Sequence, residues 1–177
     1  MSKLRLATVW LDGCSGCHMS FLDLDERLIA LGEKIELVYS PLVDTKVFPE
    51  NVDITLVEGA VSSEEDLHKV QLIRQRTKTL VSLGDCAVTA NVPGMRNAFG
   101  TKAIYDRAYR ENVTLDPGIP NETVPQLLAS ARPVHEIVAV DLFVPGCPPS
   151  ADTIFYVLNS LLEGCAAEIC AKTRFGA

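Results

Sequence analysis

Apolar residues gather in short runs along the chain, and polar residues are concentrated between the runs. Each run is rich in Val, Ile and Leu and has few polar residues inside it. Near-continuous apolar runs of this kind are typical of strands that are buried on both faces of a parallel sheet. The pattern therefore predicts a mostly parallel sheet. Its strands are expected at Leu4–Leu11, Ile35–Tyr39, Asp53–Val57, Thr79–Leu83 and Ile137–Val144.

Helical patterns separate several of these runs. In Ser20–Leu31, apolar residues recur at helical spacing, and Gly32 follows as a candidate C-terminal cap. Ser62 or Ser63 is a candidate N-cap for another helix that ends near Arg76, because acidic residues fill the first turn after it. Strands that alternate with helices predict an α/β fold with a doubly wound sheet.

One long segment, residues 87–136, departs from this alternation. It contains several prolines and no clear strand pattern, and short helices are expected around Thr101–Arg110 and Val124–Ala131. Excursions of this length inside a compact domain are usually functional or bound to a partner. No linker, repeat or low-complexity segment divides the chain, so residues 1–177 are interpreted as one domain.

Composition narrows the classes of function. The net charge of −7 argues against nucleic-acid binding, which needs a positive surface. No apolar stretch is long enough to span a membrane, and the first residues lack the pattern of a secretory signal. We therefore expect the protein in the cytoplasm, where thiols are kept reduced. Six cysteines in that compartment favour metal or redox chemistry over structural disulfides.

Four of the cysteines follow predicted strands. Cys14 and Cys17 come after the first strand, Cys86 after the fourth and Cys147 after the fifth, each beside a glycine or one residue from it. Because the carboxyl ends of parallel strands share one edge of a sheet, the four thiols are expected to converge there. Cysteine thiolates are the usual ligands of iron–sulfur clusters, and neighbouring glycines let the backbone approach a bulky group. The sequence therefore predicts one [4Fe–4S] cluster on these four residues.

Other interpretations of the cysteines remain open. Structural zinc sites prefer two close pairs of cysteines, whereas this chain has one close pair and two isolated cysteines. A thioredoxin-like redox pair would use Cys14 and Cys17 and leave Cys86 and Cys147 without a role. A flavodoxin-like module could bind flavin at the same edge, although cysteines stand where a phosphate-binding loop would be expected. The two remaining cysteines, at positions 165 and 170, are expected to be inert core residues.

Four motifs around these positions resemble those of a known family. They are WLDGCSGC at residues 10–17, VEGAV at 57–61, GDCA at 84–87 and PGCPP at 145–149. The motifs occur in order and span nearly the whole chain. Together they resemble the small subunit of [NiFe]-hydrogenases.

The resemblance implies a flavodoxin-like fold and a proximal [4Fe–4S] cluster held by Cys14, Cys17, Cys86 and Cys147. In that family the cluster exchanges electrons with a Ni–Fe centre on a separate large subunit. The chain lacks the twin-arginine signal and the C-terminal cluster ligands of the periplasmic and membrane-bound branches. It is more similar to the single-cluster small subunit of cytoplasmic, bidirectional NAD(P)-linked hydrogenases. There, diaphorase subunits carry FMN and further iron–sulfur clusters, and the small subunit is not catalytic alone.

The related cluster-bearing subunit of NADH:quinone oxidoreductase-type complexes is the alternative. It usually has adjacent cysteines at the first site, whereas Ser15 and Gly16 separate Cys14 from Cys17 in this chain. This departure ranks the alternative second.

Two residues near the motifs each have more than one candidate role. By resemblance, Glu58 lies near the cluster and the large subunit, where it could relay protons or tune the cluster. An ordinary Glu–Gly turn at a strand end explains the same residue equally well. His18 directly follows Cys17 and could donate a hydrogen bond to a sulfur or line the interface, but it is interpreted as a solvated loop histidine.

Overall fold

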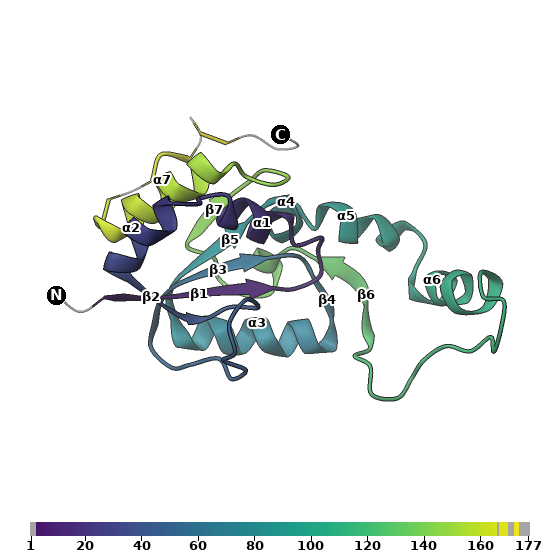
Figure 1. Ribbon diagram of the computed structural model, residues 1–177. Coiled ribbons are helices and arrows are strands. Elements are labelled where there is room, and N and C mark those ends of the chain that lie inside the picture. The colour runs from purple at the N-terminus through teal and green to yellow at the C-terminus, as the bar shows by residue number, and fades with distance from the viewer. Residues whose placement is uncertain (1–2, 166, 170–171, 174–177) are drawn as a thin grey trace.

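The protein is described by a computed structural model that covers all residues except 1–2, 166, 170–171 and 174–177. Its centre is a sheet of five strands that are all parallel, in the spatial order β2-β1-β3-β5-β7 (Figure 1). This is the flavodoxin-like order, in which β2 is added on one side of β1 and the later strands are added on the other side, beginning with β3. The predicted fold class is confirmed. The strands are β1 (Leu4–Trp10), β2 (Ile35–Tyr39), β3 (Val52–Glu58), β5 (Thr77–Leu83) and β7 (Leu142–Val144).

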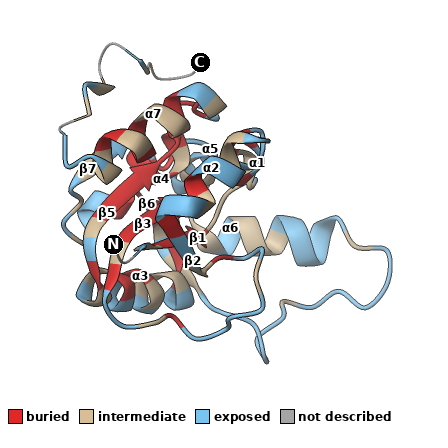
Figure 2. Cartoon of the chain, turned by 60° about the vertical axis from the view of Figure 1, so that its left-hand side comes forward, coloured by how far each residue is buried: buried red, intermediate tan, exposed pale blue. Residues whose placement is uncertain are grey.

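Helices cover both faces of this sheet, as Figure 1 shows. One face packs against α3 (Glu64–Arg76), and the other packs against α1 (Gly16–Leu22), α2 (Arg27–Lys34) and α7 (Ala151–Leu162). Each face has its own apolar core, because successive side chains of a strand point to opposite faces. Figure 2 shows the buried residues concentrated in the strands between the two helical layers. None of the helices in the described part of the chain has the length and hydropathy needed to span a membrane.

Helix α3 begins where the sequence predicts it. The Ser63 hydroxyl accepts a hydrogen bond from the Asp66 amide at 3.1 Å, and Asp66 Oδ2 accepts one from the Ser63 amide at 3.0 Å. This reciprocal capping box satisfies two backbone donors at the start of the helix. Of the two candidate caps, Ser63 is the residue that is used.

The helix expected at Ser20–Leu31 is wrong in its boundaries. The structure has two helices there, α1 and α2, separated by a turn in which Asp25 adopts a left-handed conformation with φ 53°. Aspartate tolerates that conformation better than most residues, and it interrupts the helical ladder. Gly32 lies inside α2 and does not cap it. The apolar spacing therefore predicts correctly that this segment packs into the core, but it does not predict the break between the two helices.

The fifth predicted strand, Ile137–Val144, is also too long. Only Leu142–Val144 pairs with β5, and residues 137–141 are not in a strand. Asp141 explains the late start of the strand. Its Oδ2 accepts hydrogen bonds from the Leu80 amide at 2.7 Å and from the Arg74 guanidinium at 2.6 Å. The preceding apolar side chains pack against the core from a loop.

Replacing Asp141 with Ala should lower the free energy of unfolding by about 1–3 kcal/mol, because the buried Leu80 amide loses its acceptor. Burial raises the pKa of Asp141, but the Leu80 N–H and the Arg74 cation together lower it by more than burial raises it. The pKa of Asp141 is therefore below its ordinary value. The stabilisation should therefore be present above the ordinary carboxyl pKa and be lost as the pH falls through the lower folded pKa. Urea unfolding at pH 7 and at acidic pH measures both effects.

The matched control is Asp152→Ala, which breaks a similar 2.6 Å pair with Arg27 on the surface. Exposed pairs contribute only about 0–1 kcal/mol. Equal destabilisation by the two variants would contradict the role given to Asp141.

The long excursion contains more regular structure than the sequence predicts. Its helix around Thr101–Arg110 is confirmed as α6 (Thr101–Asp106), which continues as the π-helical turn η2 (Arg107–Glu111) and stands away from the body of the protein (Figures 1 and 2). The second expected helix, Val124–Ala131, is wrong. Residues Leu127–Arg132 form strand β6, which pairs antiparallel with β4 (Val61–Ser63).

This error has a tertiary cause. Leucine and alanine favour helices locally, but β4 offers β6 a backbone partner, and that pairing overrides the weak local preference. Ala131 is then buried against Ala60 and Ala90. The excursion also contains short helical pieces, and residues 112–126 are in neither a helix nor a strand. The pieces are α4 (Asp85–Thr89), α5 (Asn91–Gly94), η1 (Met95–Ala98) and η3 (Val134–Glu136).

Candidate metal centre

The three loops that carry the four candidate cysteines lie at the carboxyl edge of the sheet. Backbone bonds hold the loop after β5 against the loop after β7. The Gly84 amide donates to the Val144 carbonyl at 2.8 Å, and the Asp85 amide donates to the Gly146 carbonyl at 2.8 Å. In return, the Gly146 amide donates to Asp85 Oδ1 at 2.7 Å. Cys86 and Cys147 are therefore presented by one hydrogen-bonded unit.

The loop after β1 is held at the same edge by β3. The Leu11 amide donates to the Glu58 carbonyl at 2.8 Å, and Asp12 and Ala60 exchange backbone bonds of 2.8 and 3.1 Å. Helix α1 begins at Gly16 and contains Cys17, and its Ser20 hydroxyl donates to the Pro149 carbonyl at 2.5 Å. The loop of Cys14 and Cys17 is thus joined to the loop of Cys147.

The four thiols are close enough to influence one another electrostatically. Cys17 is buried, Cys86 is half-buried, and Cys14 and Cys147 are exposed. Burial raises the pKa of Cys17 strongly, and Glu58 followed by the three other cysteines raises it further. Burial also raises the pKa of Cys86, against a backbone N–H from Val92 that lowers it. The raised pKa values of Cys17 and Cys86 oppose the thiolate form of these two residues, and a coordinating metal would deprotonate them.

The glycines beside the thiols leave room for sulfur. Gly84 has φ +81°, and a Cβ added there would lie 2.2 Å from Cys17 Sγ. A Cβ added to Gly16 would lie 3.2 Å from Cys14 Sγ. Side chains at these positions would fill the space that the sulfurs and their ligand need. Four thiol donors around a glycine-lined space fit an iron–sulfur cluster, whose usual ligands are cysteine thiolates.

A single metal ion needs its ligands in a different arrangement from a cluster. Within the described ranges, no three or more His, Cys, Asp or Glu side chains are grouped as the ligands of a metal ion would be. This finding concerns single ions such as zinc, whose thiolate ligands all lie about 2.3 Å from one atom. In a [4Fe–4S] cluster, each cysteine binds a different iron.

Glu58 is buried beside Cys17, with 2% of its surface exposed. Its Oε1 accepts a hydrogen bond from the Cys17 amide at 3.2 Å, and its Oε2 accepts one from the His18 amide at 2.9 Å. The His18 ring also contacts Oε2 through Nδ1. The carboxylate thus accepts two backbone N–H groups and contacts an imidazole, which is more than an ordinary Glu–Gly turn at a strand end requires.

The prediction for His18 is wrong, because this residue is buried with only 5% of its surface exposed. His18 lies in the first turn of α1, and its ring packs against Glu58. Its Nε2 has no hydrogen-bond partner among the residues that the structure describes.

Sequence reasoning missed Asn91. The side-chain Nδ2 of Asn91 lies 3.6 Å from Cys147 Sγ, within hydrogen-bonding distance for sulfur. No motif marks this residue. The only available signal was its position five residues after Cys86, at the start of the segment that leaves the edge.

The structure describes only one of the two remaining cysteines. Cys165 is exposed, so its prediction as a core residue is wrong. It follows the end of α7, where the chain leaves the packed helix. Cys170 lies outside the described residues.

Comparisons with known proteins show the family of this chain. Residues 14–161 match the family described as NADH ubiquinone oxidoreductase, 20 Kd subunit. The chain is 44% identical over 167 residues to the delta subunit of the NAD-reducing hydrogenase HoxS of Cupriavidus necator, covering 92% of this chain and 80% of that protein. It is 31% identical over 161 residues to the delta subunit of sulfhydrogenase 2 of Pyrococcus furiosus, covering 91% of this chain but only 63% of that protein.

Solved structures give the same picture. A chain in the crystal structure of an NAD+-reducing [NiFe]-hydrogenase in the H2-reduced state is 39% identical, with a TM-score of 0.93 and coverage of 98% of this chain and 99% of that one. A [NiFeSe]-hydrogenase chain of Dm. baculatum, 17% identical with a TM-score of 0.59, covers 93% of this chain and 65% of that one and shares the fold. The chain therefore belongs to the NADH ubiquinone oxidoreductase 20 Kd subunit family and, within it, to the hydrogenase subunits that include the delta subunit of HoxS.

Proposed function

We propose that this chain is the electron-transfer small subunit of a cytoplasmic, NAD(P)-linked [NiFe]-hydrogenase. Cys14, Cys17, Cys86 and Cys147 would hold one [4Fe–4S] cluster, which supplies one-electron transfer when bound. The observation that carries the proposal is the meeting of these thiols, from three separate loops, at one edge of the sheet. The relatives support it, because they include a subunit of an NAD-reducing hydrogenase.

The chain's own residues would bind, shield and orient this group. Cys17 and Cys86 supply the more buried ligands, and Cys14 and Cys147 supply the more exposed ones. Exposed apolar side chains close to the edge, among them Trp10, Met19 and Val92, favour coverage by another protein. We assign that role to the large subunit with the Ni–Fe centre. The excursion at residues 87–136 is our candidate contact for diaphorase subunits that carry FMN and further clusters.

Anaerobic purification of the complex tests this proposal. We expect about four irons and matching sulfide per chain, together with the electron paramagnetic resonance signal of a reduced cubane cluster. A partner bearing two C-x-x-C motifs, one near each end, should co-purify, and fractionation should place the complex in the cytoplasm. Stoichiometric zinc without iron, or flavin released from this chain on denaturation, would replace the proposal with one of its rivals.

A second candidate function follows from the name of the matching family. The chain could be the cluster-bearing subunit of an NADH:quinone oxidoreductase-type complex. Co-purifying proteins separate the two candidates, because that complex would lack the nickel-binding partner. Nickel analysis of the purified complex therefore decides between them.

We further propose that Glu58 tunes the cluster. Its carboxylate accepts hydrogen bonds from the Cys17 and His18 amides, which would otherwise be free to donate to sulfur. It also places negative charge beside Cys17. Both effects disfavour the addition of an electron to the cluster.

Replacing Glu58 with Gln should raise the reduction potential, because the negative charge is removed. It should also lower the free energy of unfolding by about 1–3 kcal/mol, because one buried N–H loses its acceptor. A redox titration followed by electron paramagnetic resonance measures the first effect, and thermal unfolding measures the second. An unchanged potential in a variant that retains its iron would contradict the tuning role.

A further inference from the structure

The hydrogen bonds to the candidate ligand sulfurs are concentrated on one side of the site. Asn91 Nδ2 lies 3.6 Å from Cys147 Sγ, and the backbone N–H of the next residue, Val92, is close enough to Cys86 to lower the pKa of its thiol. Two consecutive residues thus reach sulfurs that come from two different strands. Among the described residues, Asn91 is the only one whose side chain donates to one of the four candidate sulfurs.

The orientation of Asn91 is built into the backbone. Ala90, directly before it, adopts a left-handed conformation with φ 63°, which is uncommon for a residue with a side chain. The conformation is held on both sides, because the Ala90 amide donates to the Cys86 carbonyl at 3.0 Å and the Ala90 carbonyl accepts from Gly94 at 2.7 Å. Packing of Ala90 against Ala60 and Ala131 buries the turn. A conformation of this kind is unfavourable and persists only where the surroundings enforce it.

On the opposite side of the site, backbone N–H groups donate to a carboxylate. There the amides of Cys17 and His18 donate to the Glu58 carboxylate and are unavailable to sulfur. A thiolate ligand has no proton and can only accept, so the amide nitrogen of Asn91 must face Cys147 when that sulfur is coordinated. The two sides of the site therefore act on a bound cluster in opposite directions.

We propose that Asn91 is a positioning residue that raises the reduction potential of the cluster by donating a hydrogen bond to the Cys147 thiolate. This inference rests on the proposed function, in which the four cysteines hold a cluster. Reduction adds one electron to the cluster, without a proton and without making or breaking a bond. The added negative charge spreads onto the sulfurs, where an N–H donor stabilises it. Removal of the donor should disfavour the reduced form.

The test is a redox titration, followed by electron paramagnetic resonance, of the anaerobically purified complex. In Asn91→Ala, the equilibrium constant for one-electron reduction should fall roughly 3- to 10-fold, the size expected for one hydrogen bond. A tenfold fall corresponds to about 59 mV toward negative potential. Asn91→Asp should shift the potential further in the same direction, because a negative group replaces the donor while the shape of the side chain is kept.

The matched control is Asn112→Ala. Asn112 is an exposed residue of the same excursion, and its side chain has no hydrogen bond within the described part of the chain. Its potential should equal that of the wild type. Iron and sulfide are measured in every sample.

The outcomes separate this inference from the proposed function. A wild-type complex without iron removes the proposed function and this inference with it. Full iron in all samples with unchanged potentials in both Asn91 variants overturns only the role of Asn91. Loss of iron in both Asn91 variants while Asn112→Ala retains it also overturns that role, because a tuning contact is not needed for assembly.

Discussion

Replacing Cys86 with Ser is expected to reduce the iron content of the chain from about four atoms to nearly none. A serine hydroxyl is a much poorer ligand for iron than a thiolate, and the loop of Cys86 is held rigidly against the loop of Cys147. A substitute ligand therefore cannot easily move in. Without the cluster, no carrier would connect the proposed Ni–Fe site to the diaphorase, so hydrogen-linked reduction of NAD(P) should be lost as well.

Iron and sulfide analysis of the anaerobically purified variant checks this result directly. The control is Cys165→Ser, which removes an exposed thiol that is not among the electrostatic neighbours of Cys17. It should retain both iron and activity. Full iron and full activity in Cys86→Ser would remove this residue from the ligand set, and loss of iron in Cys165→Ser would show that the set was assigned incorrectly.

Replacing Gly84 with Ala should also abolish cluster binding, although no ligand is removed. The added Cβ would lie 2.2 Å from Cys17 Sγ, which is closer than real atoms approach. With φ 81° and ψ 161°, Gly84 lies in a region that is essentially restricted to glycine, so a residue with a Cβ adds strain of about 1–3 kcal/mol. Either the Cys17 side chain or the loop of Cys86 must move, and both belong to the proposed site. We expect iron to be lost even where the chain remains folded.

Two glycine controls separate crowding from backbone strain. Gly100→Ala has a similar φ of +76° but no atom within 4 Å of the added Cβ, so it reports strain alone. Gly32→Ala has neither effect and lies within α2, where alanine should be more stable than glycine by about 1 kcal/mol. Both controls should keep their iron. Thermal unfolding and iron analysis of the three variants would contradict the crowding argument if Gly84→Ala behaved like Gly100→Ala.

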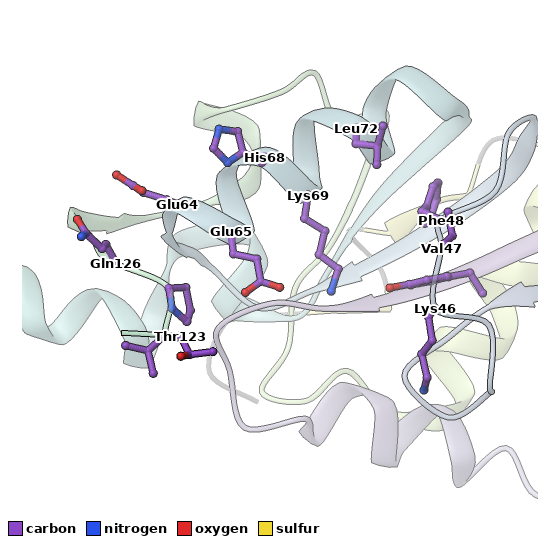
Figure 3. Close-up of a pocket in the computed structure, with 13 residues that line it drawn as sticks. Lys46, Val47, Phe48, Glu64, Glu65, His68, Lys69, Leu72, Thr123 and Gln126 are labelled. Atoms are coloured by element: carbon purple, nitrogen blue, oxygen red, sulfur yellow. The ribbon is translucent and has the colours of Figure 1, made fainter. Parts of the chain in front are cut away.

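Pocket geometry points to a different part of the surface from the cysteines. A cavity of about 930 Å³ lies between α3, the segment around Lys46–Phe48 and the segment 123–126 (Figure 3). Charged side chains of both signs line it, including Lys46, Glu65 and Lys69. None of the four candidate cysteines lines it. The site was therefore found from donor chemistry and loop position, because a cluster bound at a sheet edge needs no deep hollow in the isolated chain.

The structure shows why the site could be anticipated more fully than the excursion. Cys14, Cys17, Cys86 and Cys147 each follow an apolar run, and parallel strands bring their carboxyl ends to one edge whatever the details of the loops. The strand β6 depends on a different kind of information. Its partner, β4, lies more than sixty residues earlier in the chain, and local preferences cannot reveal that pairing.

The sequence by itself determined the α/β class, the parallel sheet, the capped start of α3 and the placement of cysteines after three strands, because these features depend on local periodicity and local hydrogen bonding. Only the tertiary structure decided the break before α2, the shortened β7, the strand β6 and the burial of His18 against Glu58. It also brought Asn91 to Cys147. These features arise from contacts between residues far apart in the chain, whose free energies exceed the weak preferences of the residues themselves.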